Sequence, residues 1–304
     1  IIENQASYNL KQALENIEQI SVADLEPWLL KMQQHPDAYG AAQVIAGIIT
    51  NNTDLVRAGI HSDPQNPHLL CVGATHKGFS EEYRQELSRR FLELDPENSL
   101  AAYIHSANLF EAGEIEQGVQ TLKSSESRFD YNDYSKDTVL LMEDAYIGSG
   151  LDLQTAKLGS TYGLPLPHLF SMGDLIKSIH GMQESMSEED ASELRSLSAM
   201  MGMRITNETQ PGSFMTHLVG LNLEEKTLEG LETGSLSPYD GLTVGEALQE
   251  IRDERIELLE ITQRTPELEM VFEGNRELQT RYIDRVRYVG EVDAMKWLLR
   301  EIEQ

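Results

Sequence analysis

Three potential metal ligands, His68, Cys71 and His76, lie close together in the sequence. His68 and Cys71 are three residues apart, so one helix could present both side chains. His76 would lie about 80° away from His68 around the same helix. A closed zinc site needs four ligands in tetrahedral geometry. The spacing therefore favours a half-buried histidine and a small buried thiol over a metal site.

A second candidate combines His180 with Glu184, four residues further on, and with Glu188 beyond a predicted turn. Zinc-binding helices place two histidines at that spacing, and here the second position is a glutamate. The sequence favours a solvated pair of side chains.

Close carboxylates are common because the chain has 51 acidic residues. Acid–base catalysis requires two carboxyl groups in different environments across a cleft. Acids next to each other near helix starts are better explained by the helix dipole, which favours negative charge there. The sequence contains neither a G-x-S-x-G elbow nor a phosphate-binding loop of the G-x-x-x-x-G-K-[ST] type. Examples of such close acidic groups are Glu224–Glu225 and Glu188–Glu189–Asp190. We therefore predict no catalytic, cofactor-binding or metal-binding residue.

Methionines cluster between residues 172 and 215. Methionine surfaces can repack around varied apolar partners, as in a binding groove. Met200, Met201 and Met203 cannot all face one side of a helix, so part of the cluster is expected to be exposed or to meet two neighbours. Gap-filling between irregularly crossing helices is the favoured interpretation. The cluster comprises Met172, Met182, Met186, Met200, Met201, Met203 and Met215.

The C-terminal region interleaves arginines with tyrosines, a pattern that can contact nucleic acid. Acidic residues such as Glu277 and Asp284 lie close by on the same predicted helix. Pairing of this helix with the acidic remainder of the chain is therefore favoured. The residues concerned are Arg276, Arg281, Arg285, Arg287, Tyr282 and Tyr288.

Composition excludes several classes of protein. The 304 residues carry a net charge of −27, which disfavours nucleic acid and anionic lipid as main partners. Forty percent of the residues are hydrophobic, enough for a sizeable core. The longest apolar run, residues 44–49, is far shorter than the ~20 residues of a membrane span. A single cysteine excludes a disulfide framework. A soluble, acidic protein is expected.

Helical periodicity extends through nearly the whole chain, and helix-start signals agree with it. Capping boxes are predicted at Ser21–Asp24, Ser171–Asp174, Ser187–Asp190 and Thr243–Glu246, and Thr265-Pro266 resembles a further helix start. An all-α fold follows. The predicted helices are 7–20, 22–34, 38–50, 53–61, 67–77, 80–94, 98–112, 114–127, 135–148, 152–160, 171–184, 188–203, 212–230, 244–263, 266–273, 276–289 and 291–303.

The main predicted break lies at Leu164-Pro165-Leu166-Pro167, because the prolines remove backbone donors and disfavour helical geometry before them. We predict two structural units, residues 1–162 and 169–304, that share an interface, since the segment is too apolar for a solvated linker.

Three similar phrases mark the first half: His35-Pro36-Asp37, Asp63-Pro64-Gln65-Asn66 and Asp95-Pro96-Glu97-Asn98. Their spacing is close to the ~34 residues of a helical hairpin repeat. After the third phrase come Leu100-Ala101-Ala102-Tyr103, a Gly113-Glu114 turn, and small Gly118 in the second helix. This pattern resembles a tetratricopeptide repeat over roughly residues 36–160. Another antiparallel helical array would have similar Asp-Pro and Gly-Glu pairs at its turns.

The resemblance implies an α-solenoid of stacked hairpins (residues 1–162), with residues 169–304 forming a helical bundle packed on it or continuing the array. It also implies a non-enzymatic interaction or scaffold protein that binds a protein or peptide partner on the repeat surface, with no cofactor. The alternatives are a helical hydrolase or lyase with an acidic cleft, and a structural cell-envelope protein. The chain starts at Ile1 without methionine, so we expect that an upstream part was removed. Whether that part held a signal peptide or an anchor is left open, and so is the localisation, with an exported or envelope-anchored location as one alternative.

Overall fold

A computed structural model describes residues 15–128, 130–182, 187–208, 213–238, 241–264 and 275–303. The described part is all-α, as predicted, and contains no β-strand, only two isolated bridge pairings. Its helices are α2 (Val22–Met32), α3 (Pro36–Ile49), α4 (Thr53–Ser62), α5 (Pro67–Thr75), α6 (Glu81–Leu94), α7 (Ser99–Glu111), α8 (Ile115–Ser124), the short 3₁₀ turn η1 (Ser125–Ser127), α9 (Ser135–Gly148), α10 (Leu153–Tyr162), α11 (Pro167–Met182), α12 (Glu188–Glu208), α13 (Phe214–Leu228), α14 (Val244–Gln263), α16 (Arg276–Val289) and α17 (Glu291–Ile302).

Most predicted helix starts are confirmed. Capping boxes open α2 and α14, and the Ser187 hydroxyl accepts from the Asp190 N–H at the start of α12. The capping box at Ser171 is wrong, because Pro167 starts α11 one turn earlier with its preset φ and missing N–H. The predicted helix 266–273 and its Thr265-Pro266 start lie outside the described residues, as does most of the predicted helix 7–20.

Helices α3 to α8 form three antiparallel hairpins packed side by side. The repeated Asp-Pro phrases have one structural role at the second and third hairpins. Asn66 and Asn98 each cap the next helix through Oδ1, while Nδ2 donates at 2.9 Å to the aspartate three residues earlier. In the first phrase, Pro36 occupies the first turn of α3. The phrases are therefore helix-start modules.

The turns within hairpins share a second device. Asn51, Gly113 and Gly150 have φ values of 50°, 77° and 97°. The backbone N–H of the residue that follows each of them donates to the carbonyl five residues before it. An example is Glu114 N–H, which donates to the Leu109 carbonyl at 2.8 Å. This Schellman arrangement satisfies the carbonyl groups at a helix end.

Small residues let the paired helices cross closely. A Cβ on Gly59 would lie 2.4 Å from the Gly40 carbonyl oxygen, and one on Gly118 would lie 2.4 Å from the Phe110 ring. Ser106 donates to the Gly118 carbonyl at 2.8 Å across the third hairpin.

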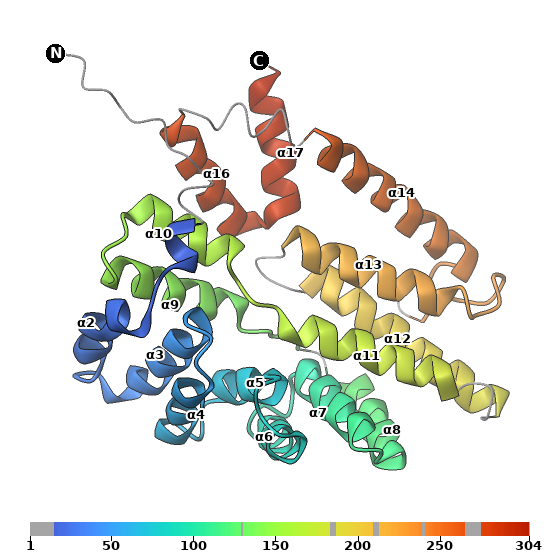
Figure 1. The fold of residues 1–304 in the computed structure, drawn as a ribbon. Coiled ribbons are helices and arrows are strands. Elements are labelled where there is room, and N and C mark those ends of the chain that lie inside the picture. Colours follow the sequence, from blue (N-terminus) through green and yellow to red (C-terminus); the bar gives the residue numbers. More distant parts are fainter. Residues whose placement is uncertain are drawn as a thin grey trace.

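After α8 the chain returns to the first hairpin. Helix α9 packs against α2, α3 and α10, and α11 packs against α5 and α7 (Figure 1). The first helices of the three hairpins, α3, α5 and α7, therefore have α9 or α11 as a neighbour. We call this side the inner face of the array. It is covered by the chain itself.

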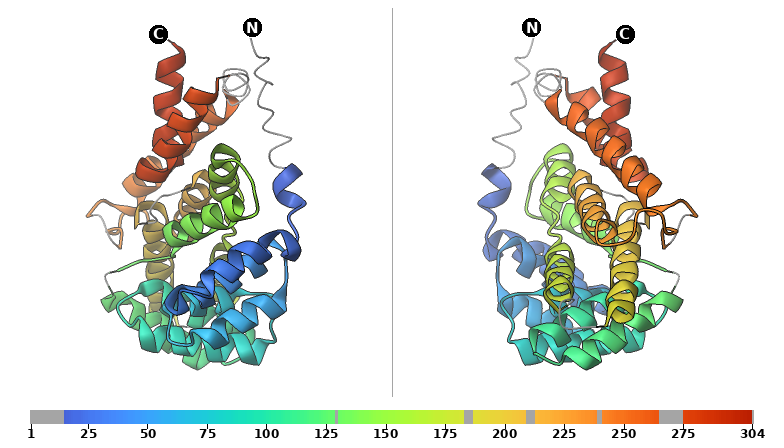
Figure 2. Two further views of the ribbon diagram at one scale, coloured as in Figure 1. Left: turned by 90° about the vertical axis from the view of Figure 1, so that its left-hand side faces the viewer. Right: turned by 90° about the vertical axis from the view of Figure 1, so that its right-hand side faces the viewer.

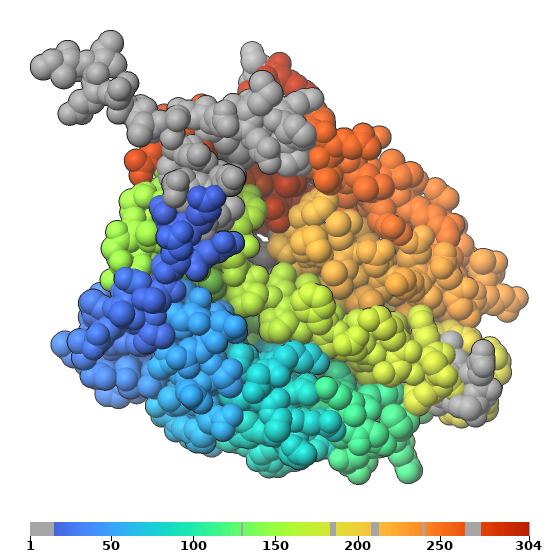
Figure 3. Space-filling model, viewed as in Figure 1, coloured from blue at the N-terminus to red at the C-terminus, as the bar shows by residue number. Residues whose placement is uncertain are grey.

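The C-terminal helices extend the molecule beyond α11. Helices α12 and α13 form a long hairpin, α13 contacts α11, and α14 contacts α13 and α17. Figure 3 shows α11 between the array and α13. In the side views of Figure 2, α14 and the α16–α17 hairpin lie at the end opposite α5–α8. None of the described helices is both long and apolar enough to cross a membrane.

The helical break predicted at the prolines is present, since α10 ends at Tyr162 and α11 starts at Pro167. The largest core cluster joins residues from both sides of this break, including Leu69, Tyr103, Met172 and Leu197. Buried Arg204 of α12 adds a polar contact, donating to the Tyr103 hydroxyl at 2.8 Å.

Candidate functional site

A cavity of about 350 Å³ lies where the array, the start of α9 and the connection before α11 meet. We call it the polar cavity. Its rim includes exposed Asn51, Lys77 and Pro165, and its deeper wall carries buried side chains. The lining residues are Gly47, Ile48, Asn51, Cys71, Val72, Thr75, His76, Lys77, Gly78, Asp133, Ser135, Thr138, Leu164, Pro165, Pro167 and His168.

Two of the lining residues, Asp133 and His168, each bury a polar atom behind the cavity wall. His168 Nε2 is 3.6 Å from Asp133 Oδ2, and their side chains are only 5% and 3% exposed. That distance is too long for a hydrogen bond. Neither atom has a hydrogen-bond partner among the described residues, although buried polar groups are nearly always paired.

Local structure fixes both groups. Asp133 lies in the turn before α9, where its Oδ1 accepts from the Ser135 N–H at 2.9 Å and caps the helix. Its Oδ2 is buried. His168 follows Pro167 in the first turn of α11. Burial lowers the pKa of His168, and the nearby Asp133 charge opposes that effect. The ring is therefore neutral at pH 7.

His68 supports the wall of the polar cavity. The Thr138 hydroxyl donates to the Tyr134 carbonyl at 3.0 Å, so the His68 Nε2–H donates to Thr138 Oγ1 at 2.8 Å. The His68 ring also stacks on Tyr134, whose hydroxyl donates to Asp95. Burial lowers the pKa of His68. These contacts hold α5 against the start of α9.

Cys71 lies on the cavity wall with a buried thiol. Burial raises its pKa, and the charges of Asp133 and Asp95 raise it further. The thiolate is the reactive form of cysteine, so this environment keeps the thiol unreactive.

The sequence group His68, Cys71 and His76 is thus divided. Cys71 and His76 line the cavity, and His76 Nε2 is 3.2 Å from the Thr53 hydroxyl, while His68 turns to Thr138. Over the described ranges, no three His, Cys, Asp or Glu side chains converge as metal ligands. Of the second group, His180 lies on α11 and Glu184 lies outside the described residues.

The other sequence candidates make structural contacts. Glu224 accepts from the Thr206 hydroxyl, Glu225 pairs with Arg252 and Arg255, and Glu188 pairs with Arg195. In the methionine cluster, Met172 and Met201 are fully buried and Met215 is 60% exposed. Met186 lies outside the described residues.

The basic–aromatic tail pairs with acidic residues of the chain, as the sequence predicts. Arg276 pairs with Asp152, Arg281 with Glu301 and Arg287 with Glu143. Arg281 and Arg285 also lie over the Trp297 ring, with their guanidinium carbons 5.1 and 5.3 Å from its centroid.

A second depression of about 560 Å³ lies between α9, α10 and α16. We call it the α9–α16 groove. Tyr288 and Leu140 on its lining are 83% and 52% exposed. Its lining residues are Lys136, Val139, Leu140, Glu143, Lys157, Asp284, Arg287 and Tyr288.

Comparisons of the chain with protein-family models, curated proteins and solved structures give no match. The two depressions and the helices that form them are therefore the features from which we infer a function.

Proposed function

We propose that the protein is a non-enzymatic binding protein that holds a small molecule in the polar cavity. One observation carries this proposal: a cavity of about 350 Å³ combines an aliphatic lining with a few polar side chains, among them Asn51, His76 and Lys77. Small-molecule sites typically combine apolar walls with a few convergent polar groups in a volume of roughly 300–1,000 Å³.

Binding is favoured over hydrolase or lyase chemistry. A nucleophile needs activation by a base or by a lowered pKa. Burial raises the pKa of the Cys71 thiol, which disfavours the reactive thiolate. Asp133 accepts a hydrogen bond from the backbone N–H of Ser135, so this contact does not activate the Ser135 hydroxyl. No described residue of the cavity supplies an activated nucleophile.

We further propose that α3–α8 form a tetratricopeptide-like array that acts as the scaffold for this site. The repeated Asn caps, the Schellman turns and the close crossing at Gly118 support this assignment. Because α9 and α11 cover the inner face, the array contributes α3 and α5 to a cavity instead of an open peptide groove.

The test is methyl NMR spectroscopy with a library of small neutral, cationic and anionic fragments. We expect at least one fragment to shift the methyl signals of Ile48, Val72 and Leu164, which line the cavity. Leu164→Trp should fill the cavity and abolish these shifts, whereas Leu140→Trp in the α9–α16 groove should preserve them. The proposal fails if no fragment perturbs the cavity methyl groups, or if Leu164→Trp leaves the shifts unchanged.

The second candidate is a protein-interaction or scaffold function through the α9–α16 groove. Its exposed Tyr288 and Leu140 provide apolar contact area, and Lys136 has no acidic partner within the part of the chain that is described. Exposed aromatic and apolar side chains beside charged residues are typical of interaction surfaces. Selection of a displayed peptide library on the native protein, followed by counter-selection on a Leu140→Glu/Tyr288→Glu variant, tests this candidate. Peptides that bind both proteins equally would contradict it.

A further inference from the structure

Helix α14 lies at the edge of the molecule in Figure 1 and Figure 2, where it packs against α13 and α17. Its 20 residues span about 30 Å. We propose that the side of α14 that faces away from α13 and α17, here called the outward face, is a docking surface for a basic amphipathic helix of a partner protein. This interaction is separate from ligand binding in the polar cavity.

The outward face is defined by exposed side chains that recur every three or four residues. Successive positions at this spacing lie on one side of a helix. The side chains that bury α14 against the rest of the protein, such as Ile251 and Leu258, fall between them in the sequence and point the other way. The exposed residues of the stripe are Gln249, Asp253, Ile256, Glu260 and Gln263.

Two apolar side chains on this face lie next to each other. Ile256 and Leu259 are each 55% exposed, and residues three apart on a helix are neighbours. Single exposed apolar residues are common on protein surfaces, whereas neighbouring ones mark interaction sites. The pair supplies the apolar contact that a partner helix would bury.

The ion pairs of α14 are directed to α13 and α17. They engage both arginines in the middle of the helix and two of its glutamates, and so hold α14 in place. No cation of the helix interior is left to neutralise the outward face. The pairs are Arg252–Glu225, Arg255–Glu225, Glu254–His217 and Glu257–Lys296.

Two carboxylates remain beside the apolar pair. Asp253 and Glu260 are exposed, and neither forms an ion pair with any residue in the described ranges. Asp253 accepts from the Gln249 side chain at 2.8 Å. At about 100° per residue, Asp253 and Glu260 lie roughly 60° and 40° around the helix from Ile256. Uncompensated negative charge therefore borders the apolar contact.

This combination selects the chemistry of the partner. Side chains at helical spacing pack into the grooves of another helix, and lysine or arginine beside an apolar stripe complements the carboxylates. The described part of the chain has no β-strand edge to which an extended segment could add. A second copy of the chain would bring two acidic faces together, and an anionic lipid surface would be repelled. The net charge of −27 would also speed encounter with a basic partner.

The probes are three synthetic helical peptides of about 18 residues with one leucine stripe in common. The positions beside the stripe are all lysine, all glutamine or all glutamate. Calorimetric titration should give a dissociation constant for the lysine peptide about tenfold lower than for the glutamine peptide, and no binding of the glutamate peptide. Added salt should narrow the difference. The lysine peptide should shift the methyl NMR signals of Ile256 and Leu259.

Matched variants separate this face from general attraction to an acidic protein. Asp253→Asn/Glu260→Gln should weaken binding of the lysine peptide about fivefold. Glu26→Gln/Glu116→Gln removes the same charge at two exposed positions on α2 and α8 and should leave the affinity unchanged.

A second comparison tests the apolar pair. Ile256→Ser/Leu259→Ser should weaken binding of the lysine peptide about tenfold, because the partner then loses its buried contacts. Leu30→Ser on α2, where the leucine is 54% exposed, should have no effect.

Equal affinity for the lysine and glutamine peptides overturns the proposal, and so do equal losses in the two charge variants or unchanged Ile256 and Leu259 signals. Self-association of the protein that Ile256→Ser/Leu259→Ser abolishes would assign the face to a second copy instead. The cavity methyl groups report on the proposed small-molecule function independently of these results.

Discussion

Asp133 Oδ2 and His168 Nε2 lie 3.6 Å apart although they belong to different helix starts, those of α9 and α11. Each residue is placed by its own local signal, the Asp133 cap and the proline before His168. The packing of α9 on α3 and of α11 on α5 brings them together. The pair is therefore a product of tertiary structure.

Asn98 should be more important for stability than Asn66. Both cap a helix, but Asn98 is 1% exposed and also exchanges bonds with Asn132, accepting from its N–H at 3.1 Å and donating to its carbonyl at 2.9 Å. Asn98→Ala should lower the free energy of unfolding by about 2–4 kcal/mol, because buried partners lose their bonds. Asn66→Ala should cost about 1 kcal/mol, the value of a cap. Urea unfolding measures both, and equal losses would contradict the prediction.

Gly59→Ala should destabilise the first hairpin, because the new Cβ would lie 2.4 Å from the Gly40 carbonyl oxygen. We expect a loss of about 1–3 kcal/mol from overpacking. The control is Gly173→Ala in α11, where no neighbouring atom of the described residues lies within 4 Å of the new Cβ. That change should stabilise the protein by about 0.5–1 kcal/mol through helix propensity. Thermal unfolding that shifts in the same direction for both variants would refute this explanation.

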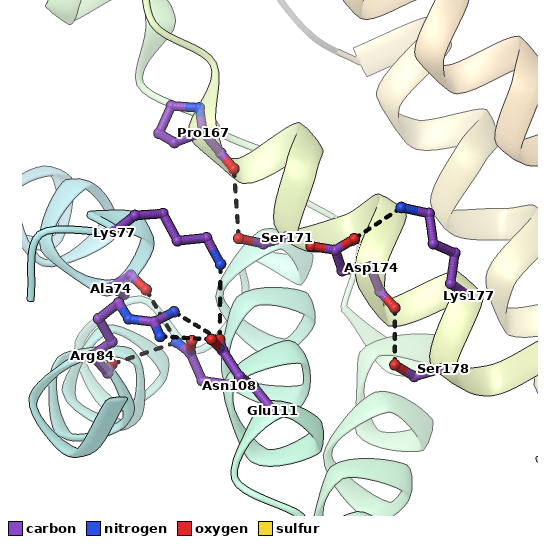
Figure 4. A network of polar contacts seen from close by, with 10 residues as sticks. All are labelled: Ala74, Lys77, Arg84, Asn108, Glu111, Pro167, Ser171, Asp174, Lys177 and Ser178. Atoms are coloured by element: carbon purple, nitrogen blue, oxygen red, sulfur yellow. Dashed lines mark hydrogen bonds and ion pairs between the residues drawn. The ribbon is translucent and has the colours of Figure 1, made fainter. Parts of the chain in front are cut away.

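Glu111→Gln should be more costly than Glu93→Gln. The Arg84 guanidinium, 7% exposed, donates to both carboxylate oxygens of Glu111 at 2.7 Å (Figure 4), and this contact lowers the pKa of Glu111. Removing the charge leaves a buried guanidinium without its counter-ion, at about 1–3 kcal/mol. Arg89 and Glu93 form a pair that is 48% and 58% exposed, so Glu93→Gln should cost less than about 0.5 kcal/mol. Chemical denaturation of the two variants at one salt concentration makes the comparison, and a larger effect at Glu93 would reverse it.

Stability should fall as the pH drops from 7.5 to 5.5. Burial lowers the pKa values of His68, His76 and His168 in the folded protein. The unfolded chain, with histidine pKa values near 6.5, then binds more protons. These histidines therefore do not reduce stability above about pH 6.5. Below that pH, down to their lowered pKa values in the folded protein, the free energy of unfolding decreases.

The measurement is the free energy of unfolding at pH 7.5, 6.5 and 5.5. His168→Asn should flatten the dependence. Glu291 acts in the opposite direction, because burial raises its pKa, and Glu291→Gln should steepen it. A native protein that gains stability towards pH 5.5 would contradict the assignment of neutral buried histidines.

Local structure could be predicted from the sequence because its causes are local. The helical period and the Ser21 and Thr243 caps involve residues within one turn of each other. The break before Pro167 follows from two prolines. The start of α11 was missed because Ser171 and Asp174 fit a capping box as well as Pro167 fits a first turn.

The polar cavity could not be predicted in the same way. Cys71 and His76 attracted attention as neighbours in sequence, whereas Asp133 and His168 carry no spacing signal. Their meeting depends on α9 packing on α3, near the start of the array. The available signals were an aspartate before a predicted helix and a histidine after a proline, and both are common.

The covered inner face has a consequence for how the chain folds. In a simple solenoid each repeat contacts only its neighbours, so folding can spread along the chain as synthesis proceeds. Here the Trp28 side chain donates to Asp144, 116 residues further along the chain, and α5 and α7 pack against α11. The first three hairpins therefore leave the ribosome with an apolar side still open, and it closes only after residue 182 has been made. Native contacts of this range slow folding and expose intermediates to aggregation. Nascent chains that end before α11 should therefore depend on chaperones, whereas chains that extend past it should not.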